Sequence, residues 1–357
     1  MYHACYLLEI LLLAAILLLA LRGGGARQLA PFDKERTLPI RGLLALFVVI
    51  GHCDTKVPGS SILNALHMST PAVAAFFFLS GYGLVKSLAR GREGYFDGFL
   101  RRSFVKLAIP VVVAAVVMCV CLKLEGRSIG LPGRIVNLVT RGRNFPQHSW
   151  FVYALAVHYA LFFVSFRWLP AKKALALFVA LSVCYNLAVR LGHWPFVWYR
   201  TSLCMSVGAA WSLYEDRIKA AVSRRGTAVL AGMLAAILAW HVASKLNTPL
   251  SRFLARDAKE LAYLLMGPAL ALVMYVVHGV PRVVASCFGF LGAISFEIYL
   301  LHFVGERNIA RLGLGGLPSC AVVVLAVVPM AYAAHKFDSW AIGRATRLVA
   351  GRRGGAR

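Results

Sequence analysis

Arg41 and His52 stand at the two ends of a mostly apolar stretch, RGLLALFVVIGH, and both side chains can do chemistry. An α-helix turns about 100° per residue, so eleven steps return His52 to within about 20° of Arg41 after about 16 Å of rise. Arginine carries a fixed charge, and histidine exchanges a proton near neutral pH. The pair favours a long anionic ligand whose reactive end reaches His52. The alternative is a histidine that only hydrogen-bonds a neighbouring helix.

A second candidate is the run FFFLSGYGL, which places Ser80, Gly81 and Tyr82 inside an apolar segment. Small residues let helices approach closely in a membrane, so packing alone explains the run. The functional alternative is a narrow channel wall where backbone and side chains contact a bound cofactor. The sequence leaves both interpretations open.

Arg101, Arg102 and Lys106 lie at the start of another apolar run, FLRRSFVKLAIP. Basic residues at a helix end commonly mark the cytoplasmic side of a membrane. Guanidinium groups also match phosphate oxygens, and Lys106 lies one helical turn after Arg102. Membrane anchoring and phosphate binding therefore both remain open for this cluster.

Two further segments, HSWFVYALAVHY and ISFEIYLLH, carry titratable residues among apolar ones. In the second segment, Ser295 and His302 are seven residues apart and share a helix face. Glu297 is a carboxylate in an apolar helix, so we expect it to pair with an arginine or histidine or to keep a proton. His158 and His302 are each either structural or functional, and His335 has no companion at a meaningful spacing.

The composition indicates a membrane protein. Hydrophobic residues make up 60% of the 357 positions and charged residues 15%. The net charge of +25 fits basic cytoplasmic loops facing anionic lipid, and no sequence motif indicates nucleic acid binding. The eight cysteines lie in or beside apolar runs without disulfide or zinc spacing, and HExxH, glycine-rich nucleotide loops and serine elbows are absent. We expect no metal site.

Apolar runs predict an all-α, polytopic transmembrane bundle of about 11 helices. The runs fall at about 5–21, 42–57, 71–89, 104–122, 149–168, 174–190, 195–214, 227–244, 260–278, 284–304 and 318–338. We expect an N-terminal signal-anchor helix within 1–30, a membrane domain over 31–345 and a basic cytoplasmic tail over 346–357. The connection 123–148 is the one long polar loop.

Lysine and arginine positions predict the orientation. If the segment joining the first two helices is cytoplasmic, the cytoplasmic loops hold nearly twice as many basic residues as the opposite side. Arg41 then lies at the cytoplasmic surface, and His52 lies at mid-membrane or deeper toward the outside. We expect a multi-pass protein of the plasma membrane.

Taken in order, these motifs resemble the acyltransferase 3 family of integral membrane acyltransferases. The resemblance covers about residues 35–345. Its motifs are Arg-x10-His at 41–52, the FFFLSGY helix, a basic helix start ending in Ile109-Pro110, Trp150-Phe151, and S-x-E-I-Y-L-L-H at 295–302. It implies a ten-helix core that moves acyl groups, usually acetyl from acetyl-CoA, onto carbohydrates or other acceptors outside.

The resemblance implies that His52 is the intramembrane base or acyl-handling residue, with Arg41 as its catalytic partner and a donor-binding residue. Trp150, Glu297 and His302 would support the site. Two departures matter: Val105 stands where an Arg-x-x-Arg pair would place its second arginine, with Lys106 one step later, and Leu155 replaces a glutamate found in many relatives.

The expected function is therefore a membrane O-acyltransferase. Cytoplasmic acyl-CoA would serve as donor substrate, with no permanently bound cofactor. Arg41, Arg101, Arg102 and Lys106 would hold its phosphates, and Ser80, Gly81 and Tyr82 would line its path to His52. The acceptor would be a hydroxyl of a carbohydrate or glycolipid, with membrane lipids as surroundings. A transporter or flippase of a lipid-linked saccharide is the alternative, although transporters more often show internal repeats.

Overall fold

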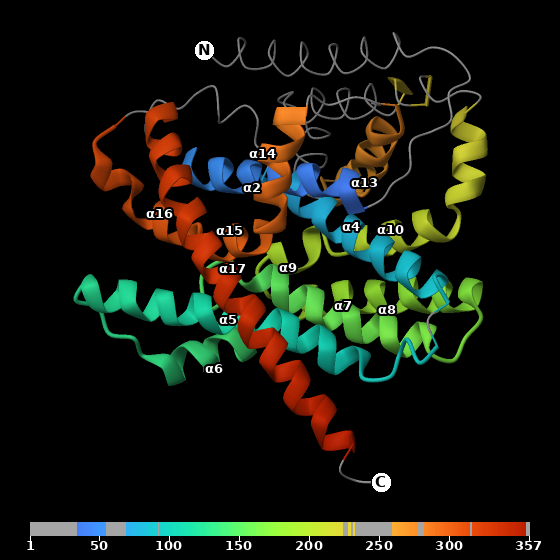
Figure 1. Cartoon of the computed structure of the whole chain (residues 1–357), viewed down its shortest axis with the longest axis horizontal. Helices are drawn as coiled ribbons and strands as arrows, with labels where there is room; N and C mark the ends of the chain where they lie inside the picture. The colour runs from blue at the N-terminus through green and yellow to red at the C-terminus, as the bar shows by residue number, and fades with distance from the viewer. Residues whose placement is uncertain are drawn as a thin grey trace. The chain divides into compact units, whose positions relative to one another are not determined.

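Every regular element in the described part of the chain is a helix (Figure 1). The computed structural model describes residues 34–54, 69–91, 93–223, 228–229, 231–232, 259–276, 282–314 and 316–354. The all-α prediction is thereby confirmed. The predicted helix at 5–21 lies outside these residues, and so does nearly all of the run at 227–244.

Five described helices are long and apolar enough to cross a membrane. They are α2 (Lys34–Asp54), α4 (Ser69–Ala89), α5 (Phe99–Leu124), α8 (Ala171–Leu191) and α17 (Gly316–Gly354). A sixth span results if the broken pair near Ile294 is counted as one, and α7 (Trp150–Phe166) and α13 (Lys259–Val276) are shorter apolar helices. The multi-pass class is confirmed, whereas the number of about 11 helices is not.

Two of the predicted continuous runs are broken. The run at 195–214 divides into α9 (Val197–Arg200) and α10 (Cys204–Leu213). Between them lie Thr201 and Ser202, both buried. The run at 284–304 is interrupted at Ile294, between α14 (Arg282–Ala293) and α15 (Ser295–Leu301), and α16 (Phe303–Asn308) follows after His302.

The connection predicted as a polar loop contains a helix, α6 (Leu131–Arg141). Pro132 lies in its first turn and Gly142 closes it in a left-handed conformation, which are favourable residues for a helix start and stop. Leu131, Ile135 and Val139 recur every four residues, so this short helix is amphipathic.

The chain divides into two compact units. The first contains the described residues of 1–51, 59–90 and 200–292, and the second those of 52–58, 91–199 and 293–357. The last turn of α2, from His52 onward, thus belongs to the second unit.

In the first unit, α4 packs closely against α10 and α13. A Cβ added to Gly81 would overlap the carbonyl oxygen of Met205, and one added to Gly208 would overlap that of Phe78. The Phe78 ring in turn fills the space left by Gly267 on α13. Therefore α4 and α10 meet backbone to backbone, and α13 packs on the Phe78 ring of α4, as small residues permit in membrane proteins.

In the second unit, α5 and α7 pack together, α7 packs on α8, and α17 contacts α5, α15 and α16. Figure 1 shows α17 crossing α5. Phenylalanines build the core beside α7: Phe99 and Phe178 both contact the fully buried ring of Phe162. Because Gly305 of α16 has no side chain, this helix can approach Val323 of α17 closely.

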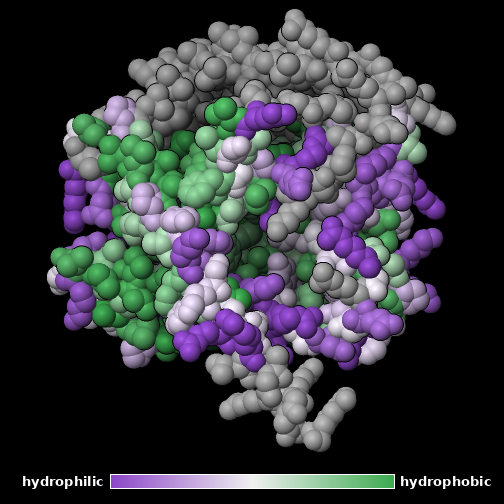
Figure 2. All heavy atoms as spheres, in the orientation of Figure 1, coloured by the Kyte–Doolittle hydropathy of each residue, from purple (hydrophilic) through white to green (hydrophobic). Residues whose placement is uncertain are grey.

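The surface of α5 carries an apolar stripe. Val112, Val116, Val120 and Leu124 are each more than half exposed and recur every four residues. Apolar side chains gather over α5 and α6 in Figure 2. Such a stripe suits contact with lipid tails, which agrees with a membrane-spanning α5.

Candidate active site

Three histidines from separate segments of the chain meet in the second unit. His52 lies in the last turn of α2, His148 just before α7, and His302 between α15 and α16. Ring centroids are 4.2 Å apart for His52 and His148, 5.0 Å for His52 and His302, and 4.5 Å for His148 and His302. The structure therefore places His302, expected in a supporting role, directly beside His52.

Glu306 supplies a carboxylate to this histidine cluster. Its Oε2 lies 2.6 Å from His148 Nε2 and accepts a hydrogen bond of 2.9 Å from Gln147 Nε2. Both His302 and Glu306 are buried. A buried carboxylate beside imidazoles stabilises the positive charge that forms when one of them takes up a proton.

Tyr299 holds two of the histidines at once. Its hydroxyl donates to the backbone carbonyl of His148 at 2.9 Å, and its own carbonyl accepts from His302 Nδ1 at 2.6 Å. His148 also has a left-handed backbone with φ of 64°, which is uncommon for a residue other than glycine. Such conformations concentrate at functional sites, where neighbouring contacts maintain them.

The Tyr299 carbonyl determines which nitrogen of the His302 ring carries the hydrogen. A carbonyl can only accept, so Nδ1 carries the hydrogen and Nε2 of a neutral ring carries a lone pair. Nε2 is buried and has no hydrogen-bond partner among the described residues. The cluster thus contains a histidine nitrogen ready to accept a proton or bind a cation.

His148, Glu306 and Tyr299 are the site residues that the sequence did not reveal. His148 opens the HSWF segment, but we singled out Trp150 and His158 there. The available signal was Glu306, which follows His302 by four residues and so lies one turn further along the helix. That spacing could have suggested a His–Glu pair, but it was not recognised.

His158 has a structural environment. Its ring is fully buried in α7, packs edge-on against Phe178 and Tyr185, and Nδ1 bonds the carbonyl of Ala154 at 2.8 Å. Trp150, two residues after His148, is the first residue of α7 and contacts Phe151.

Glu297 has the histidine partner that we expected. Its Oε1 lies 2.9 Å from His335 Nδ1 on α17. His335 has no companion at a meaningful spacing along the chain, and helix packing brings it to Glu297 across 38 positions. This hydrogen bond joins α15 to α17, beside the helix break that carries His302.

Ser80, Gly81 and Tyr82 each have a local partner in the first unit. Ser80 Oγ donates to the carbonyl of Phe76, Gly81 packs against α10, and the Tyr82 hydroxyl donates to Glu215 Oε2 at 2.9 Å. These contacts agree with the packing interpretation of the run. Its role in binding a cofactor stays a prediction.

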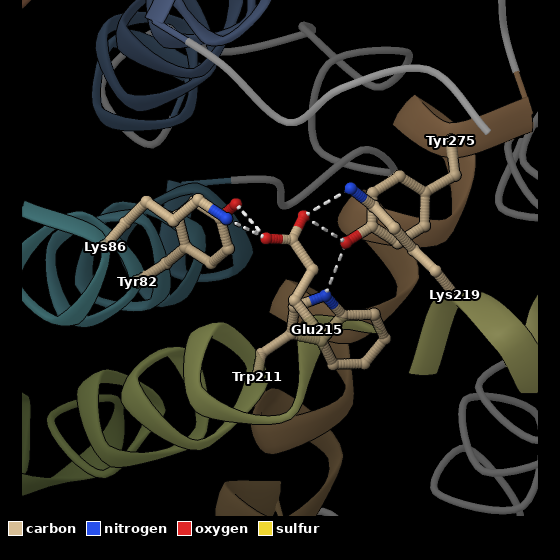
Figure 3. A network of polar contacts seen from close by, with 6 residues as sticks. All are labelled: Tyr82, Lys86, Trp211, Glu215, Lys219 and Tyr275. Carbon is tan, nitrogen blue, oxygen red and sulfur yellow. Dashed lines mark hydrogen bonds and ion pairs between the residues drawn. The ribbon is translucent and has the colours of Figure 1, made fainter. Parts of the chain in front are cut away.

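Glu215 is the centre of a polar network at the end of α4 (Figure 3). It is 3% exposed and also accepts from Lys86, Lys219 and Tyr275, the last of which accepts from Trp211. Burial by itself would raise the pKa of Glu215. The hydrogen bonds from Lys86, Lys219 and Tyr82 outweigh that effect and lower the pKa to about 2.

The basic cluster lies exposed at the start of α5, as a phosphate site would require. Arg102 already donates to the carbonyls of Asp97 and Tyr95, which closes the turn before the helix. Arg101 and Lys106 are exposed on the same segment. Arg41 is partly buried on α2, in one continuous helix with His52.

The model of the acyltransferase domain family matches residues 40–334, which is most of the chain. The chain belongs to the acyltransferase 3 family. The match spans every segment that contributes to the histidine cluster, from His52 to Glu306. No curated protein and no solved structure matches this acyltransferase significantly.

Proposed function

We propose that this membrane acyltransferase transfers an acetyl group from cytoplasmic acetyl-CoA to a hydroxyl of a carbohydrate or glycolipid at the outer side of the plasma membrane. The family match supports acyl transfer in general. The transporter alternative gains no support from that match. Donor, acceptor and sidedness are the parts of the proposal that experiments must decide.

The observation that carries the proposal is the position of His52 beside two histidines and a carboxylate. Acyl transfer to a hydroxyl needs a base that takes the hydroxyl proton, and histidine is the side chain most often used for this. His52 is partly exposed, whereas His302 and Glu306 are buried. His148 is also partly exposed but is held by the Glu306 carboxylate, so we assign the substrate-facing role to His52.

In the base route, His52 takes the proton from the acceptor hydroxyl as the oxygen attacks the thioester carbon. The new C–O bond forms, the C–S bond breaks, and the coenzyme A thiolate receives the proton. Glu306, through His148, stabilises the positive charge on the cluster while the proton is held there. In the alternative route, His52 carries the acyl group between donor and acceptor.

The donor's phosphates find candidate partners in Arg101, Arg102 and Lys106, which are exposed at the start of α5. We keep Arg41 as a donor-binding residue because of its spacing from His52 along α2. The helical rise of about 16 Å between them is about half the thickness of a bilayer core, and the flexible arm of coenzyme A has roughly that reach.

Mass spectrometry of surface glycans and glycolipids from cells with and without the gene tests the proposal. We expect one class of glycan to lose an acetyl mass increment, and the increment to return with the wild-type gene but not with His52→Ala. Unchanged acylation in the deletion strain, together with no transfer by the purified protein from radiolabelled acetyl-CoA, would overturn it.

A further inference from the structure

The histidine cluster also has the composition of a transition-metal site. One donor atom from each of His52, His148, His302 and Glu306 lies within 4.8 Å of the other three. Imidazole nitrogens with a carboxylate oxygen are ligands that Zn²⁺ and similar ions prefer. The donors around a tetrahedral zinc ion lie about 3.4 Å apart, so side-chain movements of about an ångström would close the site.

His302 points independently to a cation. Its Nδ1 donates to the Tyr299 carbonyl, which is the arrangement that commonly orients a metal-binding histidine. Its Nε2 is left as a buried lone pair without a hydrogen-bond partner among the described residues. The His302 ring stacks on the His148 ring, with their centroids 4.5 Å apart. This nitrogen therefore belongs to the histidine cluster.

Two donors come from one helical turn. The backbone NH of Glu306 bonds the carbonyl of His302 at 3.0 Å, so the two side chains lie one turn apart on one face. Pairs at this spacing occur in helical zinc sites. The hydrogen bond from Gln147 Nε2 to Glu306 would remain available as an outer contact.

We propose that His52, His148, His302 and Glu306 bind one divalent transition-metal ion of the Zn²⁺ class, and that the bound ion switches off acyl transfer. Four protein donors fill a tetrahedral zinc ion, which leaves no open position for substrate. A coordinated His52 nitrogen also has no lone pair with which to accept a proton. The second half of this proposal rests on the proposed function, and the first half does not.

Metal binding is tested without substrate. The full chain, purified without a histidine tag and stripped with EDTA, is equilibrated with Zn²⁺ and desalted, and bound zinc is measured by mass spectrometry. We expect about one zinc per chain. In EDTA-stripped protein loaded with Co²⁺, visible absorption should show a tetrahedral site.

Two variants each remove one metal-binding atom but keep the local hydrogen bonds. His302→Asn retains an NH that reaches the Tyr299 carbonyl, and Glu306→Gln retains the shape of the side chain. Each should weaken zinc affinity by at least about 100-fold, beyond the 10–100-fold typical of outer contacts. The exposed His193, also in a left-handed conformation, provides the matched control His193→Asn, which should bind zinc normally.

Inhibition is then measured as acetyl transfer with and without equimolar Zn²⁺. We expect loss of activity that EDTA restores. If the wild type binds no more zinc than His302→Asn, the metal site is refuted, even if transfer is normal. If zinc binds but the stripped protein transfers no acetyl group to any acceptor, the proposed function fails and the metal site stands.

Discussion

The imidazole Nε2 of His148 lies 2.6 Å from the Glu306 carboxylate, although 158 positions separate the two residues. This contact joins the segment before α7 to the broken helix that follows α15. It also places a negative charge beside the ring that packs on His52.

His52→Ala should reduce acetyl transfer by at least about 100-fold, because the loss of a positioned base costs about 10²–10⁴ in rate. Membrane expression should be unchanged, since the ring is partly exposed. Initial rates in membranes with matched protein levels check this, with His193→Asn as the control. Full activity in His52→Ala would remove the residue from the mechanism.

Glu306→Gln should lower kcat while leaving the KM for acetyl-CoA nearly unchanged, because it removes the charge that stabilises a protonated cluster. Glu125→Gln is a matched control. Glu125 is another partly buried carboxylate of the second unit, paired with Arg307. That control should lower thermal stability without lowering kcat; equal kcat losses in both variants would assign Glu306 a purely structural role.

Arg41→Ala should raise the KM for acetyl-CoA or lower turnover by about 10–100-fold. That is the effect expected from the loss of one hydrogen bond to a charged group. Transfer from acetyl-pantetheine, which lacks the phosphates, should be insensitive to the change. Steady-state kinetics with both donors make the comparison. An unchanged dependence on acetyl-CoA would exclude Arg41 from donor binding.

Gly81→Ala should destabilise the protein by about 1–3 kcal/mol, because the added methyl overlaps the Met205 backbone and forces α4 away from α10. Gly83→Ala, on the same helix with open space around it, should be neutral or stabilising by up to about 1 kcal/mol. Thermal unfolding in detergent measures both. Equal midpoints for the two variants would contradict the close crossing.

Glu215→Gln should lower the unfolding midpoint near neutral pH, and the difference from wild type should shrink in acid. The folded-state pKa of Glu215 is depressed from 4.5 to about 2. Its carboxylate therefore stabilises the fold above about pH 4.5, and this contribution is lost as the pH falls toward about 2. Exposed Glu93→Gln should show no such trend, and a Glu215→Gln difference independent of pH would be evidence against the assignment.

The sequence predicted the helical class and the positions of most described helices, because long apolar runs dominate membrane chains. It could not show the breaks at 201–203 and Ile294, since broken and continuous runs have the same hydropathy. It also missed α6, where amphipathic spacing is hidden among polar residues. Of the histidine cluster, the sequence motifs singled out His52 and His302, and Glu297 was expected to have a partner.

His148 and Glu306 were missed for a physical reason. A cluster assembled from three segments depends on tertiary packing, which periodicity along one helix cannot reveal. The contact of His335 with Glu297 was not predicted for the same reason, because the two residues lie on α17 and α15. Local spacing identified Arg41 with His52 on one helix, but it could not identify residues brought together across the fold.

The close crossing of α4 and α10 also constrains biogenesis. The segment 91–199, which belongs to the second unit, is synthesised between these two helices. When α4 leaves the ribosome, the glycine-lined surface that Gly81 presents has no Met205 or Gly208 to meet. The first unit can close only after α10 and α13 have been synthesised, so α4 must wait for these two partners until that point.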